Sequence, residues 1–140
     1  MIDPKDFNVP LQYKHWSGDP AEDRVGPFFF RIEEGIVYSA FRLQAEHCNS
    51  HQSAHGGILM MFADYSLCIA ANGGEEESVA TVSCNSEFVG PAIVGDLICG
   101  RAEVSRRGGS LVFARVQLSV NDTIILDASG VIKRLRPKHR

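Results

Sequence analysis

The sequence lacks the features that mark secreted, membrane-spanning and nucleic-acid-binding proteins. Its N-terminus places Asp3, Lys5 and Asp6 before Pro10, so the apolar core of a signal peptide is missing. No stretch is long and apolar enough to span a bilayer. The formal net charge of -3 is too small to argue for a nucleic-acid partner. We therefore expect a cytoplasmic protein that binds neither nucleic acid nor a membrane.

Other motifs are missing as well. The four cysteines contain no Cys-x-x-Cys pair and lie in unrelated contexts, which favours free thiols over a disulfide framework: Cys48, Cys68, Cys84 and Cys99. No Gly-x-Ser-x-Gly elbow occurs, which argues against a serine α/β-hydrolase. No repeat, linker or low-complexity segment suggests a second domain. A chain of 140 residues that is 44% hydrophobic is therefore expected to form one domain with a sizeable core.

What the sequence does contain is one long apolar segment, from His55 to Asn72, which predicts a helix. Ala, Leu, Met and Ile dominate it without proline, and Gly73-Gly74 can end it with a left-handed residue. Apolar residues surround its axis, so other elements must wrap it. Asp64 in the middle is the only charged residue from Ile58 to Gly74. Such a carboxylate is either used in chemistry or held structurally, at a wet edge or as a loop cap.

The start of this helix carries the pair Gly56-Gly57. The first turn of a helix has free backbone N–H groups and a positive dipole end. Without side chains in the way, a ligand oxygen can approach these donors, which is how a backbone oxyanion hole is built. The alternative is that the two glycines only form a tight turn.

The two ends of this segment point in different directions. Asp64 lies nine positions after His55, so at ~100° per residue the two face opposite sides of the helix, ~13 Å apart along its axis. Asp64 cannot easily serve a substrate bound at its own Gly-Gly turn. If both belong to one site, two copies of the helix must contribute, which predicts a two-fold homodimer with sites between subunits.

The other segments predict an α+β fold. Apolar alternation and turn residues predict strands over 27–32, 36–43, 78–88, 96–106, 110–120 and 124–135. Successive hairpins indicate an antiparallel sheet of about six strands, and its apolar face needs a partner layer. The helix is the only candidate, so the sheet is expected to wrap around it. We divide the chain into an N-terminal arm (1–26), one domain (27–136) and a basic tail (137–140).

With these residues in place, the chain resembles a hotdog-fold acyl-CoA thioesterase. The similarity is to the branch that contains the phenylacetic-acid-degradation (PaaI-like) thioesterases, and it covers roughly residues 28 to 135. Its core is Asn49, five residues, His55-Gly56-Gly57, six residues, and Asp64. The segment from Gly90 to Asp96 is also similar to that branch. The resemblance implies hydrolysis of acyl-CoA thioesters without metal or cofactor, by dimers or dimers of dimers, at sites between subunits.

The resemblance also implies roles for single residues. The Gly56 amide would polarise the thioester carbonyl with Gly57 beside it, and Asn49 would hold that carbonyl or a nearby water. Asp64 would be the general base, or the nucleophile through an acyl anhydride. Thr81, or Ser83 as the near alternative, would hold the water, and His55 would support the loop. Asn49 as a plain turn residue and Thr81 as an ordinary strand residue remain alternatives.

Coenzyme A brings phosphates, and the basic residues at one predicted hairpin suit them. Arg106 and Arg107 could bind phosphate, helped by the alternating Arg134, Arg136 and Lys138. The alternative is a solvated hairpin followed by an ordinary basic tail.

Three further questions stay open at this stage. His47, His51 and His55 recur at the spacing of a helical zinc pair, although Cys48-Asn49-Ser50 favours a loop there. A non-catalytic acyl-CoA binder of the same fold is the second alternative. The acyl group is not specified either, because four residues could line its pocket or simply pack the core: Met60, Met61, Phe62 and Tyr65.

Overall fold

The computed structural model describes residues 1–135 of the chain. Its secondary-structure elements, in chain order, are η1 (Pro4–Phe7), β1 (Lys14–His15), α1 (Pro20–Val25), β2 (Phe29–Glu33), β3 (Ile36–Arg42), η2 (Ala45–His47), α2 (Gly56–Asn72), β4 (Val79–Phe88), β5 (Leu97–Arg107), β6 (Leu111–Val120) and β7 (Thr123–Arg134). The predicted helix and all six predicted strands are confirmed, with ends that differ by at most two residues. The predicted tail, 137–140, lies outside the described residues.

The strands form one antiparallel sheet in the order β1-β2-β3-β5-β6-β7-β4. The seventh strand, beyond the six predicted, is the two-residue β1 from the N-terminal arm. The prediction of successive hairpins fails at one place, because β4 pairs with β7 and not with its chain neighbour β5. The segments 73–78 and 89–96 that flank β4 are longer than hairpin turns, so they can carry it to the far edge of the sheet.

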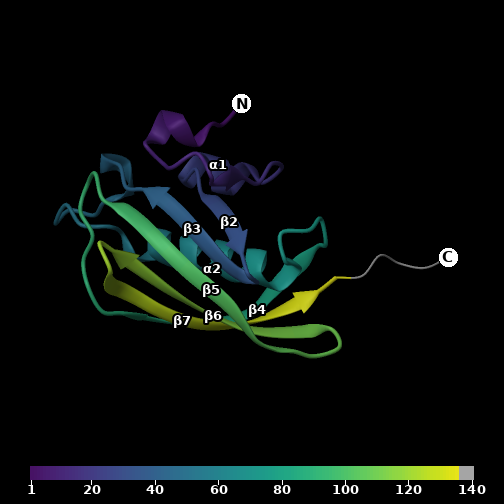
Figure 1. The fold of residues 1–140 in the computed structure, drawn as a ribbon. Coiled ribbons are helices and arrows are strands. Elements are labelled where there is room, and N and C mark those ends of the chain that lie inside the picture. The colour runs from purple at the N-terminus through teal and green to yellow at the C-terminus, as the bar shows by residue number, and fades with distance from the viewer. Residues whose placement is uncertain (136–140) are drawn as a thin grey trace.

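The sheet curves around α2 (Figure 1), as the sequence predicted. Phe28, Phe41 and Phe62 form the centre of the core, with ring centroids 5.0 to 5.4 Å apart. All three are almost fully buried, which accounts for the apolar character of the helix on most of its faces. The helix ends as predicted, because Gly73 adopts φ 66° and its N–H donates to the carbonyl of Ile69.

The N-terminal arm packs against this core and is not a loose extension (Figure 1). The ring of Trp16 packs against Phe30 at 6.1 Å between centroids. His15 and Asp23 are joined by a 2.6 Å contact that ties β1 to α1. The carbonyl of Val25, at the end of α1, accepts a 2.5 Å hydrogen bond from His47 Nε2. The arm is therefore fixed to both the sheet and the loop that precedes α2.

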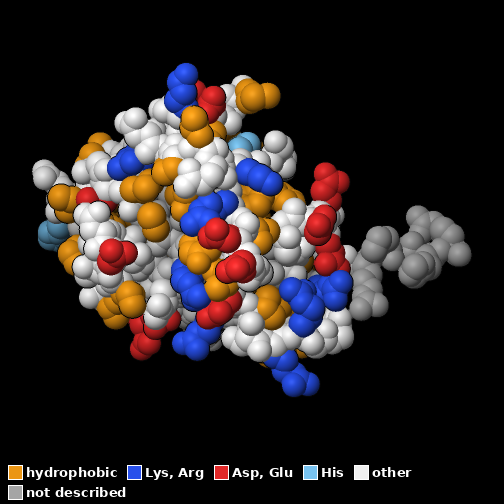
Figure 2. All heavy atoms as spheres, viewed as in Figure 1, with side chains coloured by type: hydrophobic (Ala, Val, Ile, Leu, Met, Phe, Trp, Pro, Cys, Tyr) orange, Lys and Arg blue, Asp and Glu red, His pale blue; other side chains and the backbone are white. Residues whose placement is uncertain are grey.

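The surface agrees with the modest net charge. On the face in Figure 2, basic and acidic side chains are interspersed with apolar ones. None of the helices within residues 1–135 is long and apolar enough to cross a membrane. All four cysteines are free thiols, as their spacing predicted.

Candidate active site

Asp64 lies at the centre of a small polar cluster on the middle of α2. Thr81, from the edge strand β4, donates a hydrogen bond to Asp64 Oδ1 at 2.5 Å. Cys68, one turn further along α2, places Sγ 3.4 Å from Thr81 Oγ1 and 3.9 Å from Asp64 Oδ1. One carboxylate oxygen of Asp64 is thus held by protein groups. Of the two predicted hydroxyl residues, Thr81 and not Ser83 makes this contact.

The thiol of Cys68 stays protonated in this cluster. Burial, reinforced by the negative charge of Asp64, raises its pKa to about 12. A thiol with such a pKa is a poor nucleophile, because the thiolate is the reactive form. Cys68 therefore serves as a weak donor and packing group beside Asp64.

The cluster opens into a cavity of about 620 Å³. It lies between α2, the start of β4 and the N-terminal arm, and its fourteen lining residues are Trp16, Ser17, Asp19, Glu22, Asp64, Tyr65, Cys68, Ile69, Asn72, Glu76, Glu77, Ser78, Val79 and Thr81. A volume of this order is typical of a small-molecule site. Of the residues weighed for the acyl pocket, Tyr65 lines this cavity, whereas Phe62 belongs to the buried core.

At the start of α2, the backbone leaves the amide of Gly56 free. The N–H groups of Ile58 and Leu59 donate to the carbonyl of His55 at 3.0 and 3.2 Å. The N–H of Gly57 donates to His55 Nδ1 at 3.1 Å, so His55 caps the helix. Within residues 1–135 no acceptor is found for the Gly56 N–H. The geometry therefore makes Gly56, and not Gly57, the available donor.

Gly56 has a steric reason to be glycine. A Cβ at this position would lie 3.2 Å from Cε1 of Phe88 at the end of β4. Phe88 is itself half exposed. The helix start is therefore open to ligands on one side and bordered by an aromatic ring on the other.

The loop before α2 is organised by Asn49 and His47. Asn49 Oδ1 accepts hydrogen bonds from the N–H groups of His51 and Ser53 at 2.9 and 3.3 Å. The side-chain oxygen of Asn49 thus stabilises a turn, whereas its side-chain nitrogen has no protein acceptor among the described residues. His47 uses both ring nitrogens, accepting from the Gln44 N–H and donating to the Val25 carbonyl.

These contacts bear on the zinc alternative. With both nitrogens engaged, His47 could bind a metal only by giving up a hydrogen bond. Within residues 1–135, no group of three or more His, Cys, Asp and Glu side chains is arranged to hold a metal.

Two of the basic residues considered for phosphate binding, Arg107 and Arg134, have structural partners. Arg107 Nη1 donates to the carbonyl of Ala71 at 2.9 Å, at the carboxyl end of α2, where a cation is favoured by the helix dipole. Arg134 pairs with Glu77 at 2.8 Å. The phosphate role of Arg106 and Arg107 stays a prediction, and Arg136 and Lys138 lie outside the described residues.

The two halves of the predicted site are separate within one protomer. The cavity around Asp64 contains neither Gly56 nor Asn49 nor His55 among its lining residues. Asp64 and the helix start thus occupy different surroundings, as their nine-residue separation predicted.

Comparisons with known proteins identify the family. A model of the thioesterase superfamily matches residues 51–124. The chain is 33% identical over 129 residues to PA0474 of Pseudomonas aeruginosa, whose name describes a proposed esterase; the match covers 89% of this chain and 96% of that protein. The chain belongs to the thioesterase superfamily. It is also 29% identical over 93 residues to the acyl-coenzyme A thioesterase PaaI of Escherichia coli K12, covering 66% of each protein.

Solved structures of thioesterases share its fold. The PaaI protein of Escherichia coli has a TM-score of 0.78 at 21% identity, covering 86% of this chain and 88% of that one. A hypothetical thioesterase from Streptococcus pneumoniae, solved with coenzyme A, has a TM-score of 0.71 at 13% identity, covering 80% of this chain and 91% of that one. The fold is the hotdog fold of the PaaI-like thioesterases, and membership in this superfamily indicates a hydrolase of thioester bonds in general.

Sequence reasoning missed two groups of residues around Asp64. Cys68 follows Asp64 by four residues, and this helical spacing was a sufficient signal. The acidic residues of the arm, Asp19 and Glu22, gave no such signal, because only the tertiary structure brings α1 over the cavity.

Proposed function

We propose that this protein is an acyl-CoA thioesterase that hydrolyses its substrate to a free acid and coenzyme A. The observation that carries the proposal is the contact between Thr81 and Asp64 at the wall of the 620 Å³ cavity. A carboxylate with one oxygen held and access to a small-molecule cavity is suited to act as a general base.

The reaction needs one water, one base and one oxyanion site. Asp64 Oδ1 accepts a hydrogen bond from the Thr81 hydroxyl, which leaves Oδ2 to take a proton from water. The resulting hydroxide attacks the thioester carbon, and negative charge develops on the carbonyl oxygen. The Gly56 N–H, at the positive end of α2, stabilises that charge. Collapse of the intermediate breaks the C–S bond, and the departing coenzyme A thiolate takes up the proton.

Because Asp64 and Gly56 are apart in one protomer, we propose a homodimer in which each site combines Asp64 of one subunit with Gly56 of the other. The edge strand β4, which carries Thr81, supports this arrangement. Among residues 1–135 it has no pairing strand on one side, and apolar side chains on and after it are well exposed: Val82, Phe88, Val89, Ile93 and Val94. An exposed apolar edge strand is suited to pairing with a second chain.

Coenzyme A as the thiol part of the substrate is supported by the relatives. PaaI of Escherichia coli is named an acyl-coenzyme A thioesterase, and the Streptococcus pneumoniae structure contains coenzyme A. Asn49 and His55 precede Gly56 in the chain, and we propose that they contact the thioester or its water. These roles are part of the proposal.

The test is thiol release from a panel of acyl-CoA substrates by the wild-type protein and by Asp64→Asn. Asparagine keeps the shape and the contact with Thr81 but cannot take a proton, so we expect kcat to fall by ~10²-fold or more. Asp122→Asn, in the exposed turn before β7, is the matched control and should retain activity. Full turnover by a folded Asp64→Asn variant would reject the role of Asp64. Binding of acyl-CoA without turnover by the wild type would favour the non-catalytic binder instead.

A further inference from the structure

We propose that the cavity beside Asp64 selects its acyl group by charge. It favours an acyl chain that ends in a positively charged amine over a neutral chain, and it rejects a chain that ends in a carboxylate. This inference rests on the proposed thioesterase function, and it extends that function to the class of substrate.

The first observation is the charge of the cavity wall. Five of its fourteen lining residues are acidic, and none of these fourteen is Lys or Arg: Asp19, Glu22, Asp64, Glu76 and Glu77. Glu77 is neutralised by Arg134 outside the cavity. The remaining carboxyls face the cavity without a cationic partner among residues 1–135. Such a wall attracts a cation and repels an anion.

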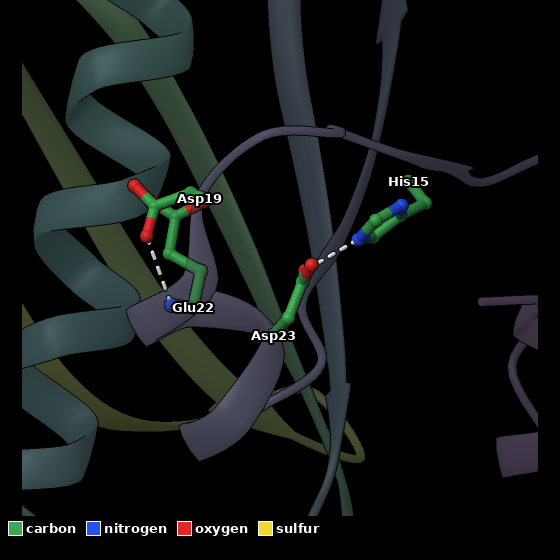
Figure 3. A network of polar contacts seen from close by, with 4 residues as sticks. All are labelled: His15, Asp19, Glu22 and Asp23. Carbon is green, nitrogen blue, oxygen red and sulfur yellow. Dashed lines mark hydrogen bonds and ion pairs between the residues drawn. The ribbon is translucent and has the colours of Figure 1, made fainter. Parts of the chain in front are cut away.

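The second observation is how the arm presents two of these carboxyls. Asp19 caps α1 by accepting the N–H of Glu22 at 3.0 Å. Figure 3 shows that the side chains of Asp19 and Glu22 lie on the side of α1 that faces the long helix, whereas Asp23 points away to His15. The arm therefore holds Asp19 and Glu22 toward the cavity, and among residues 1–135 it pairs only Asp23 of the three with a basic side chain.

The third observation is an unpartnered hydroxyl. Tyr65 lines the same cavity and is only 3% exposed, and its hydroxyl oxygen is buried without a hydrogen-bond partner among the described residues. A buried hydroxyl left in this state is costly unless a ligand or water satisfies it. A phenol oxygen can accept a hydrogen bond from an ammonium group.

The fourth observation is aromatic. Trp16 from the arm and Tyr65 from α2 both line the cavity. Indole and phenol rings attract cations, most strongly where carboxylates and burial reduce competition from water. Carboxyls, an unpaired hydroxyl and two aromatic rings together form a wall suited to an ammonium group. An apolar acyl end would leave the carboxyls and the hydroxyl without partners.

The state of Glu22 agrees with this reading. Burial and the nearby charges of Asp19, Asp23 and Asp64 raise its pKa to about 8. The charged form of Glu22 is thus disfavoured in this cavity, and a bound cation would favour it.

The experiment compares three acyl groups of similar length: ε-aminohexanoyl-CoA, heptanoyl-CoA and adipoyl-CoA. For wild-type protein at pH 8, we expect kcat/KM for the amino substrate to exceed that for heptanoyl-CoA by ~10-fold, with adipoyl-CoA at least ~10-fold worse than heptanoyl-CoA. In Glu22→Gln, the preference for the amino over the neutral substrate should fall by ~5-fold. Glu46→Gln, which removes an exposed carboxylate outside the cavity, should leave the preference unchanged.

A binding measurement separates this inference from the proposed function. Calorimetry on wild-type protein with non-hydrolysable thioether analogues of the three compounds reports charge preference without turnover. A preference for the amino analogue supports the inference even if no thioester is hydrolysed. The absence of hydrolysis would contradict only the proposed thioesterase activity. Equal affinity for the three analogues, or an unchanged preference in Glu22→Gln, overturns the inference even if all three thioesters are hydrolysed.

Discussion

Among single residues, Thr81 is the strand side chain that contacts Asp64 of the helix in the proposed site. Asp64 alone on α2 would be a partly buried carboxylate with only the weak thiol contact of Cys68. The hydroxyl of Thr81 gives Oδ1 a donor at 2.5 Å and so fixes the orientation of the carboxylate. A positioned base is more effective than a mobile one, because misplacement of a catalytic group is costly.

Thr81→Val, which keeps the shape and removes the donor, should therefore lower kcat by ~10-fold with little change in KM. Thr81→Ser retains a hydroxyl and should restore most of kcat. Steady-state kinetics on the best acyl-CoA of the panel checks both variants. A KM effect with unchanged kcat would assign Thr81 to substrate binding instead.

Glu22 makes the stability of the protein depend on pH. Its pKa is about 8 in the folded protein and about 4.5 ordinarily. Below pH 4.5 Glu22 is protonated in both the folded and the unfolded state, so it does not lower the free energy of unfolding. As pH rises toward 8 the unfolded chain releases the proton first, and the free energy of unfolding falls.

Glutamine cannot ionise, so the free energy of unfolding of Glu22→Gln should not fall in this way as the pH rises. Because the carboxyl is partly exposed, solvent screening limits the effect to about 1 kcal/mol, or about 3 °C in Tm for a chain of this size. We expect the variant to melt about 3 °C above wild type at pH 9 and at the same temperature at pH 4. Thermal unfolding at the two pH values measures this, and a Tm difference independent of pH would contradict the role of Glu22.

At the scale of elements, the start of α2 combines a cap, a free donor and an aromatic border. His55 occupies the Gly57 amide, so the Gly56 N–H is the one available donor of the pair. His55 has φ −65° and ψ 130°, a backbone conformation that also suits a residue before proline. Proline is favoured in the first position of a helix, so the donor can be removed while the helix remains.

Gly56→Pro should fold, with Phe88 shifting slightly, and should lose ~10²–10³-fold in kcat, the scale of a lost oxyanion donor. In Gly56→Ala the new Cβ contacts Phe88 but the N–H is kept, so the loss in kcat should be much smaller. Circular dichroism checks the helix and thiol release checks the rate. Equal losses in the two variants would mean that crowding by Phe88, and not the donor, is responsible.

For the whole molecule, the main question is where the two halves of the site meet. Asp64 and Gly56 lie in different surroundings in one protomer, and the unpaired edge of β4 exposes apolar side chains. A two-fold dimer would bring one subunit's Asp64 to the other's Gly56 and would cover this edge.

Complementation between two inactive variants tests this arrangement. Asp64→Asn and Gly56→Pro subunits, unfolded together in equal amounts and refolded, should form mixed dimers with one intact site each. Random pairing makes half of the dimers mixed, so activity should return to about a quarter of wild type. Each variant refolded alone provides the control. If no activity returns although mixed dimers are detected, the site lies within one subunit.

The sequence by itself determined the helix and strand ranges and singled out the candidate catalytic residues along α2. Apolar runs and turn residues are local signals, so the helix, its glycine end and the six strands were predicted to within two residues. The separation of Asp64 from Gly56 followed from helix geometry alone. The family resemblance predicts that Thr81 holds the water, whereas its hydrogen bond to Asp64 comes from the tertiary structure.

Only the tertiary structure decided the position of β4 at the sheet edge and the arm's contribution to the cavity. Strand order depends on long-range pairing, which no local pattern of residues 78–88 encodes. Glu22 and Tyr65 are 43 positions apart in the sequence, and they line one cavity because the tertiary structure brings α1 to the side of that cavity opposite α2. Contacts of this kind arise from packing between distant segments, which is why the acidic wall of the cavity was not visible in the sequence.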